Sequence, residues 1–278
     1  MKRSVAFQGE LGAFSQVAAS QLAAGFTPLP LAAFELVFEA VANGKCDAAV
    51  IPSGNTLHGS VHENYEHLLK YDLPSQGETF VRIVHNLIVP PGVRRGHIRR
   101  VYSHPVALNQ CRHFFAANPQ FEKTPFYDTA GSVKMLMENG LTDAGAIASA
   151  TAAEIYGARI LQKSIEDDRE NYTRFFLLKR PKKSAPARQI SNVRYKTSVV
   201  FTVRNTPGAL FRALSAFALR DLNLTKIESR PLRGKPWDYL FYVDFIGHTS
   251  DPVTKHALSH LAELADMWRV LGCYPAAG

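Results

Sequence analysis

The sequence predicts an α/β protein in two parts, a larger N-terminal part and a smaller C-terminal part with the element order βαββαβ. Three observations carry this prediction. The chain has 278 residues, enough for two compact domains. Short apolar runs alternate with helical patterns up to about residue 178, a rhythm typical of mostly parallel sheets. The basic stretch 179–196, rich in Pro, Lys, Ser and Ala, has the composition of a linker. We therefore expect domains at 1–183 and 194–278, joined by a linker at 184–193.

The first part alternates strand-like and helix-like segments in chain order. The apolar runs that indicate strands are 4–7, 47–52, 81–89, 99–103, 124–128, 145–149 and 173–178. Segments with helical spacing, most of them ending on glycine or asparagine, lie between the strands at 33–44, 62–71, 105–118, 129–140 and 149–157. Sheets of this kind bind small molecules at the carboxyl ends of their strands, where polar loops meet helix N-termini.

The second part follows a regular pattern. A strand at 196–203 and a helix at 208–220 precede two paired strands, and a further helix and strand complete the chain; the last three strands are expected at 222–230, 237–247 and 268–274. Asp251 and Pro252 have the residue types of a helix cap and a first helical residue. The order is that of a ferredoxin-like fold, one sheet with two helices on a single face.

Composition excludes several classes of protein. No stretch approaches 18 uninterrupted apolar residues, and the apolar run near the start is too short for a secretory signal, so we expect no membrane association and a cytoplasmic protein. The cysteines, Cys46, Cys111 and Cys273, are far apart and show no CxxC spacing. Neither a disulfide framework nor a metal site is expected.

The net charge of +8 is concentrated in a few places. The stretch 179–196 contains seven basic residues and no acidic residue, and a second basic cluster lies at 94–100. Tyr195, near the end of the first run, is the one aromatic residue in these two stretches, whereas a stacking platform for nucleic acid requires several interleaved aromatic side chains. Nucleic-acid binding is therefore not expected.

Five short polar clusters lie at predicted strand ends: "GELGAFS" (9–15), "PSGNTLHGS" (52–60), "SHP" (103–105), "DTAGS" (128–132) and "NYTRF" (171–175). Most of them begin or precede a helix, where unsatisfied backbone N–H groups favour an anion. The same residue types are ordinary helix caps, so one cluster alone carries little weight. Five in one domain predict a cleft for an acidic ligand, and the sequence has no GxGxxG, Walker, HExxH or GxSxG motif.

These clusters resemble the prephenate dehydratase family. The resemblance is carried by "VAFQGELGAFS", "GNTLHGSVHENYEHLL", "SHPVALNQC" and "NYTRFFLL", and "PGALFRALSAFALRDLNLTKIESRP" is similar to the ACT domain attached to that family. Several C-terminal stretches also resemble the plant arogenate dehydratases. The resemblance implies a two-lobed, periplasmic-binding-protein-like domain that converts prephenate to phenylpyruvate in phenylalanine biosynthesis, without a cofactor or metal.

The family's chemistry gives roles to Thr173 and Arg174. Arg174 would hold a substrate carboxylate through parallel hydrogen bonds, and Thr173 would donate a hydrogen bond to the departing C4 hydroxyl. On a regular strand these neighbours point to opposite faces. They could share a cleft only if the chain is still loop-like there; otherwise Thr173 is an ordinary strand residue and Arg174 an ion-pair partner.

The resemblance implies further site residues. Supporting catalytic contacts are expected from Asn55, Thr56, Ser103 and His104, and substrate contacts from Ser15, Thr129 and Phe175. His104 has a pKa suited to proton exchange, but its place before Pro105 also fits a structural role. His58 and the histidines at 62, 67 and 113 are expected to be solvated. Gly54 stands where the family typically has a glutamate. If that glutamate shapes or polarises the cleft, the activity is expected to be reduced or the substrate to differ.

In the second part the resemblance implies an effector site for phenylalanine, bound between ACT domains of different subunits. The residues expected there are Gly208, Ala209, Leu210, Glu228, Ser229 and Arg230. A homodimer or homotetramer through the ACT domains is expected. Two alternatives stay open: an arogenate dehydratase, and a non-catalytic small-molecule sensor.

Overall fold

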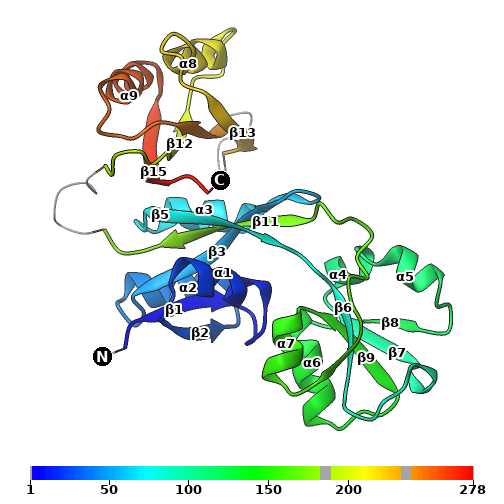
Figure 1. Ribbon diagram of the computed structural model, residues 1–278. Helices are drawn as coiled ribbons and strands as arrows, with labels where there is room; N and C mark the ends of the chain where they lie inside the picture. The colour runs from blue at the N-terminus through cyan, green and yellow to red at the C-terminus, as the bar shows by residue number, and fades with distance from the viewer. Residues whose placement is uncertain (1, 182–188, 233–238, 278) are drawn as a thin grey trace. The chain divides into compact units, whose positions relative to one another are not determined.

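The computed structural model describes residues 2–181, 189–232 and 239–277 (Figure 1). The chain forms two compact units. The first contains the chain up to Tyr71 together with Thr79–Leu177, and the second contains Asp72–Glu78 and the chain from Leu178 onward. Residues 184–188 of the expected linker lie outside the described residues.

The first unit contains two α/β lobes. The sheet of lobe one has the order β5-β11-β3-β1-β2, and β1 runs parallel to β2 and β3. Its strands are β1 (Ser4–Gln8), β2 (Thr27–Leu31), β3 (Ala48–Asn55), β5 (Ser75–Arg82) and β11 (Tyr172–Leu178), and the short β4 (Gly59–Ser60) pairs with β3. The start of β5, up to Glu78, and the last residue of β11, Leu178, are assigned to the second unit. The helices of this lobe are α1 (Phe14–Leu22), α2 (Phe34–Ala42) and α3 (His62–Lys70).

Lobe two is the middle of the chain. Its sheet has the order β10-β6-β9-β7-β8, with β7 parallel to β8 and β9. The strands are β6 (Asn86–Val89), β7 (Arg100–Ser103), β8 (Glu122–Pro125), β9 (Ala144–Ala148) and β10 (Arg159–Gln162). The helices are α4 (Pro105–Asn109), α5 (Arg112–Ala116), α6 (Thr129–Glu138) and α7 (Ala150–Ile155), with a 3₁₀ turn, η1, at Arg95–His97. The expected two-lobed α/β class is confirmed.

Several expected elements differ in extent from the observed ones. The apolar run 81–89 is two strands, because the chain leaves β5 at Arg82 and enters the other lobe as β6. The expected helix 105–118 is broken into α4 and α5. Strand β2 was not predicted because it contains Pro28 and Pro30; at the edge of its sheet a missing N–H costs no ladder bond. Strand β10 was also missed.

The glycine-rich opening joins the two lobes. Gly9 has φ 112°, and a Cβ there would lie 2.9 Å from Asp128 Oδ2. Gly12 has φ 90°, and a Cβ there would lie 2.5 Å from the Cα atom of Ala152 in α7. The hydroxyl of Ser149, at the start of α7, donates to Gly12 O at 2.6 Å. At Gly12 glycine is required because the backbone of α7 approaches too closely for any side chain, and at Gly9 the positive φ favours glycine.

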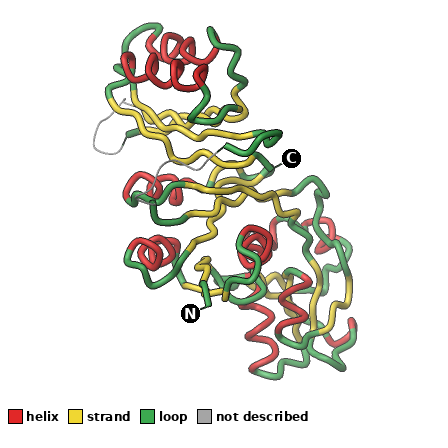
Figure 2. The backbone as a smooth tube through the Cα atoms, turned by 60° about the vertical axis from the view of Figure 1, so that its left-hand side comes forward, coloured by secondary structure: helices red, strands yellow, loops and turns green. Residues whose placement is uncertain are grey.

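The second unit has the expected order βαββαβ. Its elements are β12 (Tyr195–Thr202), α8 (Ala209–Ala218), β13 (Leu224–Pro231), β14 (Tyr239–Ile246), α9 (Pro252–Leu264) and β15 (Met267–Pro275). The strands pair antiparallel in the order β13-β14-β12-β15, and Figure 2 shows both helices on one face of this sheet. The ferredoxin-like class is therefore confirmed, although residues 237–238 of one expected strand lie outside the described part of the chain.

Each unit has its own core. In the second unit, Val199, Phe217, Phe245 and Leu261 are among the fully buried side chains that join the sheet to α8 and α9. In lobe one, Phe7, Val50 and Phe175 are buried with α1. Among the described helices, none combines the length and the apolar character needed to cross a membrane.

Candidate active site

Strand β11 carries the residues on which the sequence expectation centred. Thr173 and Phe175 both line a pocket of about 330 Å³ in the first unit, which we call the Thr173 pocket. The surface of the pocket consists mostly of apolar atoms, to which Phe14, Val61, Ile83 and Phe175 contribute. Phe175 is 2% exposed and forms the buried floor next to Thr173.

Arg174 lies on the other face of β11. Its guanidinium carbon is 4.6 Å from the centroid of the Phe176 ring, and Arg174 is not among the described residues that line the Thr173 pocket. Because the strand is already regular at Tyr172, residues 173 and 174 point to opposite faces. The structure therefore does not bring these two side chains into one hollow, contrary to our expectation from the sequence.

Asn55, at the end of β3, fixes the orientation of Thr173. Asn55 Nδ2 donates to Thr173 Oγ1 at 3.0 Å, to Asn171 Oδ1 at 2.7 Å and to Tyr172 O at 3.1 Å. Asn55 Oδ1 accepts from the backbone N–H groups of residues 57 and 58, which assigns the oxygen and nitrogen of the amide. Since the Thr173 oxygen is an acceptor in this contact, its own proton is available to a group in the pocket.

Thr56 and Ser103 have structural contacts instead of pocket contacts. The Thr56 hydroxyl donates to Glu170 O at 2.7 Å and accepts from Tyr172 N at 3.0 Å, which ties the end of β3 to the start of β11. Ser103 is fully buried and donates to Ile147 O at 2.6 Å within the sheet of lobe two. Neither side chain is among the described residues that line the pocket.

The remaining expected residues do reach the Thr173 pocket. Ser15 at the start of α1, Thr129 at the start of α6 and His104 before α4 all line it. His104 Nδ1 accepts from Val106 N at 3.2 Å, so this nitrogen caps α4. The imidazole of His104 thus has a structural contact as well as a place in the pocket.

A chain of polar side chains, His85, Gln110 and His58, also lines the pocket, and sequence reasoning gave none of them a place in the site. His85 is 2% exposed, and its Nε2 lies 2.8 Å from Gln110 Oε1, while Gln110 Nε2 lies 3.2 Å from His58 Nδ1. Burial lowers the pKa of His85, so its imidazole is neutral. Nε2 donates to Gln110, so Nδ1 carries no hydrogen and is a buried acceptor without a partner. Burying this acceptor costs less free energy than burying an N–H donor without a partner. His58 is exposed, as expected, yet it also lines the pocket.

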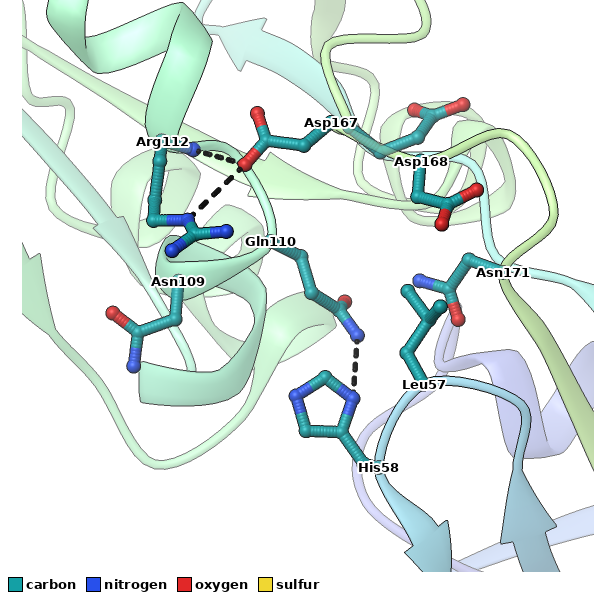
Figure 3. A pocket seen from close by; sticks show the side chains of 9 residues that line it. Leu57, His58, Asn109, Gln110, Arg112, Asp167, Asp168 and Asn171 are labelled. Atoms are coloured by element: carbon teal, nitrogen blue, oxygen red, sulfur yellow. Dashed lines mark hydrogen bonds and ion pairs between the residues drawn. The ribbon is translucent and has the colours of Figure 1, made fainter.

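A second pocket, of about 540 Å³, adjoins the first through His58 and Gln110, which line both. We call it the Asp168 pocket, and Figure 3 shows its side chains. It is markedly polar; Leu57, Asn109, Arg112, Glu166, Asp167, Asp168 and Asn171 complete its lining. Asp167 accepts from the backbone N–H groups of Arg112 and His113, both at 2.9 Å, and so holds the start of α5. Sequence reasoning gave no role to the acidic residues 166–168.

Gly54 does not need to be glycine for lack of space. A Cβ there would lie 3.5 Å from Gly59 O, an ordinary contact distance. The missing carboxylate is therefore not forced by the backbone at this position.

The expected effector residues lie in the second unit. Gly208 has φ 76° and caps α8, so Ala209 and Leu210 are the first residues of that helix. Ala209 also lines a pocket of about 330 Å³ with Arg204 and Arg212. Glu228, Ser229 and Arg230 lie on β13, where Arg230 Nη2 bonds Glu228 Oε1 at 2.8 Å and Ser229 faces solvent.

Comparison with known proteins gives consistent matches over the whole chain. A family model described as prephenate dehydratase matches residues 5–183, and an ACT domain model matches residues 197–263. A chloroplastic arogenate dehydratase/prephenate dehydratase 2 of Arabidopsis thaliana is 44% identical over 98% of this chain and 72% of its own length. Arogenate dehydratase 2 of Petunia hybrida is 42% identical, over 98% and 71%.

Two solved structures are also similar. A prephenate dehydratase from Arthrobacter aurescens in complex with L-Phe superposes with a TM-score of 0.88 at 31% identity, over 99% of this chain and 92% of that one. A protein described as GqqA, a novel type of quorum quenching acylase, has a TM-score of 0.90 at 35% identity, over 99% and 98%.

Proposed function

The chain belongs to the prephenate dehydratase family and carries an ACT domain, and on this basis we propose that it removes carbon dioxide and water from prephenate, or from arogenate, to give the aromatic ring. Enzymes of this family are dehydratases, a class of carbon–oxygen lyase. The observation that carries the proposal is the Thr173 hydroxyl, oriented by Asn55 so that its proton is free for a ligand in the pocket.

We propose that the reaction starts at the C4 hydroxyl of the substrate. Formation of the aromatic ring drives the reaction, so the protein has to stabilise negative charge on the departing hydroxyl. Thr173 donates a hydrogen bond to that oxygen, and Asn55 in turn donates to Thr173, which makes the threonine a better donor. An isolated threonine does not lose its proton fully, so it acts as an oriented donor in the transition state: the C4–O bond breaks as the electron pair of the ring carboxylate enters the ring, and the departing hydroxide takes its proton from solvent to leave as water.

The apolar lining supports the loss of carbon dioxide. Phe14, Val61, Ile83 and Phe175 exclude water around the substrate ring. A carboxylate on the ring is destabilised by such surroundings, whereas neutral carbon dioxide is not.

We propose that helix N-termini, in place of Arg174, hold the anionic substrate. Phe14 and Ser15 begin α1, and Ser60 and Val61 precede α3; all four line the Thr173 pocket. Neither helix has a side-chain cap. In this proposal the positive ends of both helix dipoles position the ring carboxylate, while the apolar lining keeps water away from it. Ser15, Thr129 and His104 supply further polar contacts.

The test is turnover by the purified protein with no added cofactor. Prephenate should give phenylpyruvate, measured by ultraviolet absorbance, and arogenate should give phenylalanine, measured by chromatography. A non-catalytic sensor would be stabilised against heat by the same compounds without forming product. Absence of product from both compounds would reject the proposal.

Acyl-amide hydrolysis deserves a parallel assay, since one similar structure is described as an acylase. A hydroxyl nucleophile needs an adjacent general base. Among the described contacts, no hydrogen bond joins the Thr173 hydroxyl to a histidine or a carboxylate. The site geometry thus favours the dehydratase.

We propose that phenylalanine regulates the enzyme through the ACT domain, with Gly208–Leu210 and Glu228–Arg230 supplied by different copies of the chain. The similar Arthrobacter aurescens protein was solved with L-Phe. Phe211 and Ile227 are large apolar residues with 76% and 50% exposure, as expected for surfaces covered in a homodimer or homotetramer. Light scattering with and without phenylalanine tests the assembly. A cytoplasmic location remains a proposal, because the Arabidopsis relatives are named chloroplastic.

A further inference from the structure

The Asp168 pocket contains a buried hydrogen-bond donor without a partner. Asn171 is 1% exposed, and its Oδ1 accepts from Asn55 Nδ2 at 2.7 Å. Its Nδ2 has no hydrogen-bond partner, and Figure 3 shows the amide at the edge of the pocket it lines. An unsatisfied buried donor carries a desolvation penalty, which a ligand acceptor such as a carboxylate oxygen would relieve.

The three acids of this pocket differ in what they already bind. Glu166 accepts from Arg82 Nη2 at 3.2 Å and from His85 N at 2.9 Å. Asp167 holds the start of α5 through two backbone N–H groups. Asp168 Oδ1 accepts from the nearby Glu170 N at 2.8 Å. Among the described contacts, this local turn bond is the one bond recorded for the Asp168 carboxylate, so Asp168 is the acid best placed to bind a cation from the pocket.

A donor for a carboxylate and an anion for an ammonium group are together what an α-amino acid requires. Asn171 Nδ2 and the exposed Arg112 guanidinium, whose Nε lies 3.6 Å from Asp167 Oδ2, can meet the carboxylate, and Asp168 can meet the ammonium. Prephenate and arogenate both carry this side-chain carboxylate. They differ at the neighbouring carbon, which is a ketone in prephenate and bears an ammonium group in arogenate. A ketone oxygen beside Asp168 would face a second acceptor.

We propose that the Asp168 pocket binds the amino acid end of the substrate while the ring occupies the Thr173 pocket, and that Asp168 makes the enzyme prefer arogenate over prephenate. The two pockets adjoin at His58 and Gln110, so one molecule spans both. This inference rests on the proposed dehydratase function and assigns the residue that selects between its two substrates.

The test compares kcat/KM for arogenate and for prephenate in wild type and Asp168→Asn. The wild type should prefer arogenate. Loss of one charge-assisted bond at an exposed carboxylate should lower kcat/KM for arogenate about tenfold or more, mainly through KM. The value for prephenate should stay within twofold or rise. Glu170→Gln is the matched control: it removes an equal charge two residues away, from a side chain outside the described pocket lining, and should leave the ratio unchanged.

Other outcomes overturn the inference. A parallel fall for both substrates would show a merely structural role for Asp168, and an unchanged ratio would remove it from the site. A wild-type preference for prephenate would also reject the inference while leaving the proposed function intact. Turnover of neither substrate would reject both.

Discussion

Replacement of Thr173 by valine removes the hydroxyl and keeps the shape of the side chain. The structure indicates a small effect on folding. Asn55 Nδ2 has three acceptors within 3.1 Å, namely Asn171 Oδ1, Thr173 Oγ1 and Tyr172 O, but its amide carries only two hydrogens. Two acceptors remain in the variant, so no buried donor is orphaned. The cost to the free energy of unfolding should be at most about 1 kcal/mol.

The effect on catalysis should be much larger. A donor aimed at charge that develops in the transition state contributes about 2.7–4 kcal/mol, which is about 10²–10³ in kcat. Because the hydroxyl acts on the departing oxygen in the transition state, KM should change little. We therefore expect Thr173→Val to lower kcat by about 10²- to 10³-fold, with a melting temperature close to that of the wild type.

The measurement is steady-state kinetics with each substrate, with thermal unfolding of every variant. Thr173→Ser is the matched control, because it restores the hydroxyl on the same backbone and should recover most of the activity. A Thr173→Val enzyme that keeps kcat within about threefold of the wild type would refute the donor role. A loss confined to KM would equally contradict it, since the hydroxyl would then act in substrate binding.

Three further variants test other features. Arg174→Ala should lower the melting temperature by losing the stacking on Phe176, worth about 0.5–2 kcal/mol, with less than a tenfold change in kcat/KM; a large rise in KM would instead place Arg174 on the substrate. Burial lowers the pKa of His85 in the folded chain, so as the pH falls below 6.5 the imidazole is protonated in the unfolded chain before it is protonated in the folded chain. Below pH 6.5 the wild type should therefore lose stability relative to His85→Gln, by at most about 1.4 kcal/mol per pH unit in denaturant titrations; parallel pH curves would contradict this. Gly12→Ala should destabilise by more than about 1 kcal/mol, since its Cβ would meet the Ala152 backbone; an unchanged melting temperature would show that the contact opens easily.

The fold was predictable where local pattern and tertiary environment agree. The βαββαβ order of the second unit follows from strong periodicity and from the cap at Asp251 and Pro252. The apolar run 81–89 was predicted as one strand because it is rich in valine and isoleucine along its whole length. Its two halves, β5 and β6, pair with strands of different sheets, and this is visible only in the structure. The edge position that permits prolines in β2 is likewise a property of the whole sheet.

The site was predictable as a set of segments and less so as a set of side chains. All the polar clusters lie at strand or helix ends, yet the hydroxyls of Thr56 and Ser103 donate to backbone carbonyl oxygens and do not reach the pocket. The divergence of Thr173 and Arg174 follows from strand geometry alone once β11 is known to be regular at Tyr172. His58 and Gln110 reach the site only through the meeting of two lobes, which no local sequence pattern encodes.

Asn55 has a wider role than a supporting polar contact, because a single amide orients donors in both pockets. Its Nδ2 donates a hydrogen bond to Asn171 Oδ1, so the other end of that amide, Asn171 Nδ2, is available to a ligand in the Asp168 pocket. The same Nδ2 also donates to Thr173 Oγ1, so the hydroxyl proton of Thr173 is available to a ligand in the Thr173 pocket. A carboxylate at position 55 could not donate to either oxygen, so both neighbours would have to turn toward it. The catalytic donor and the substrate-binding donor therefore depend on the same amide, although they serve opposite ends of the substrate.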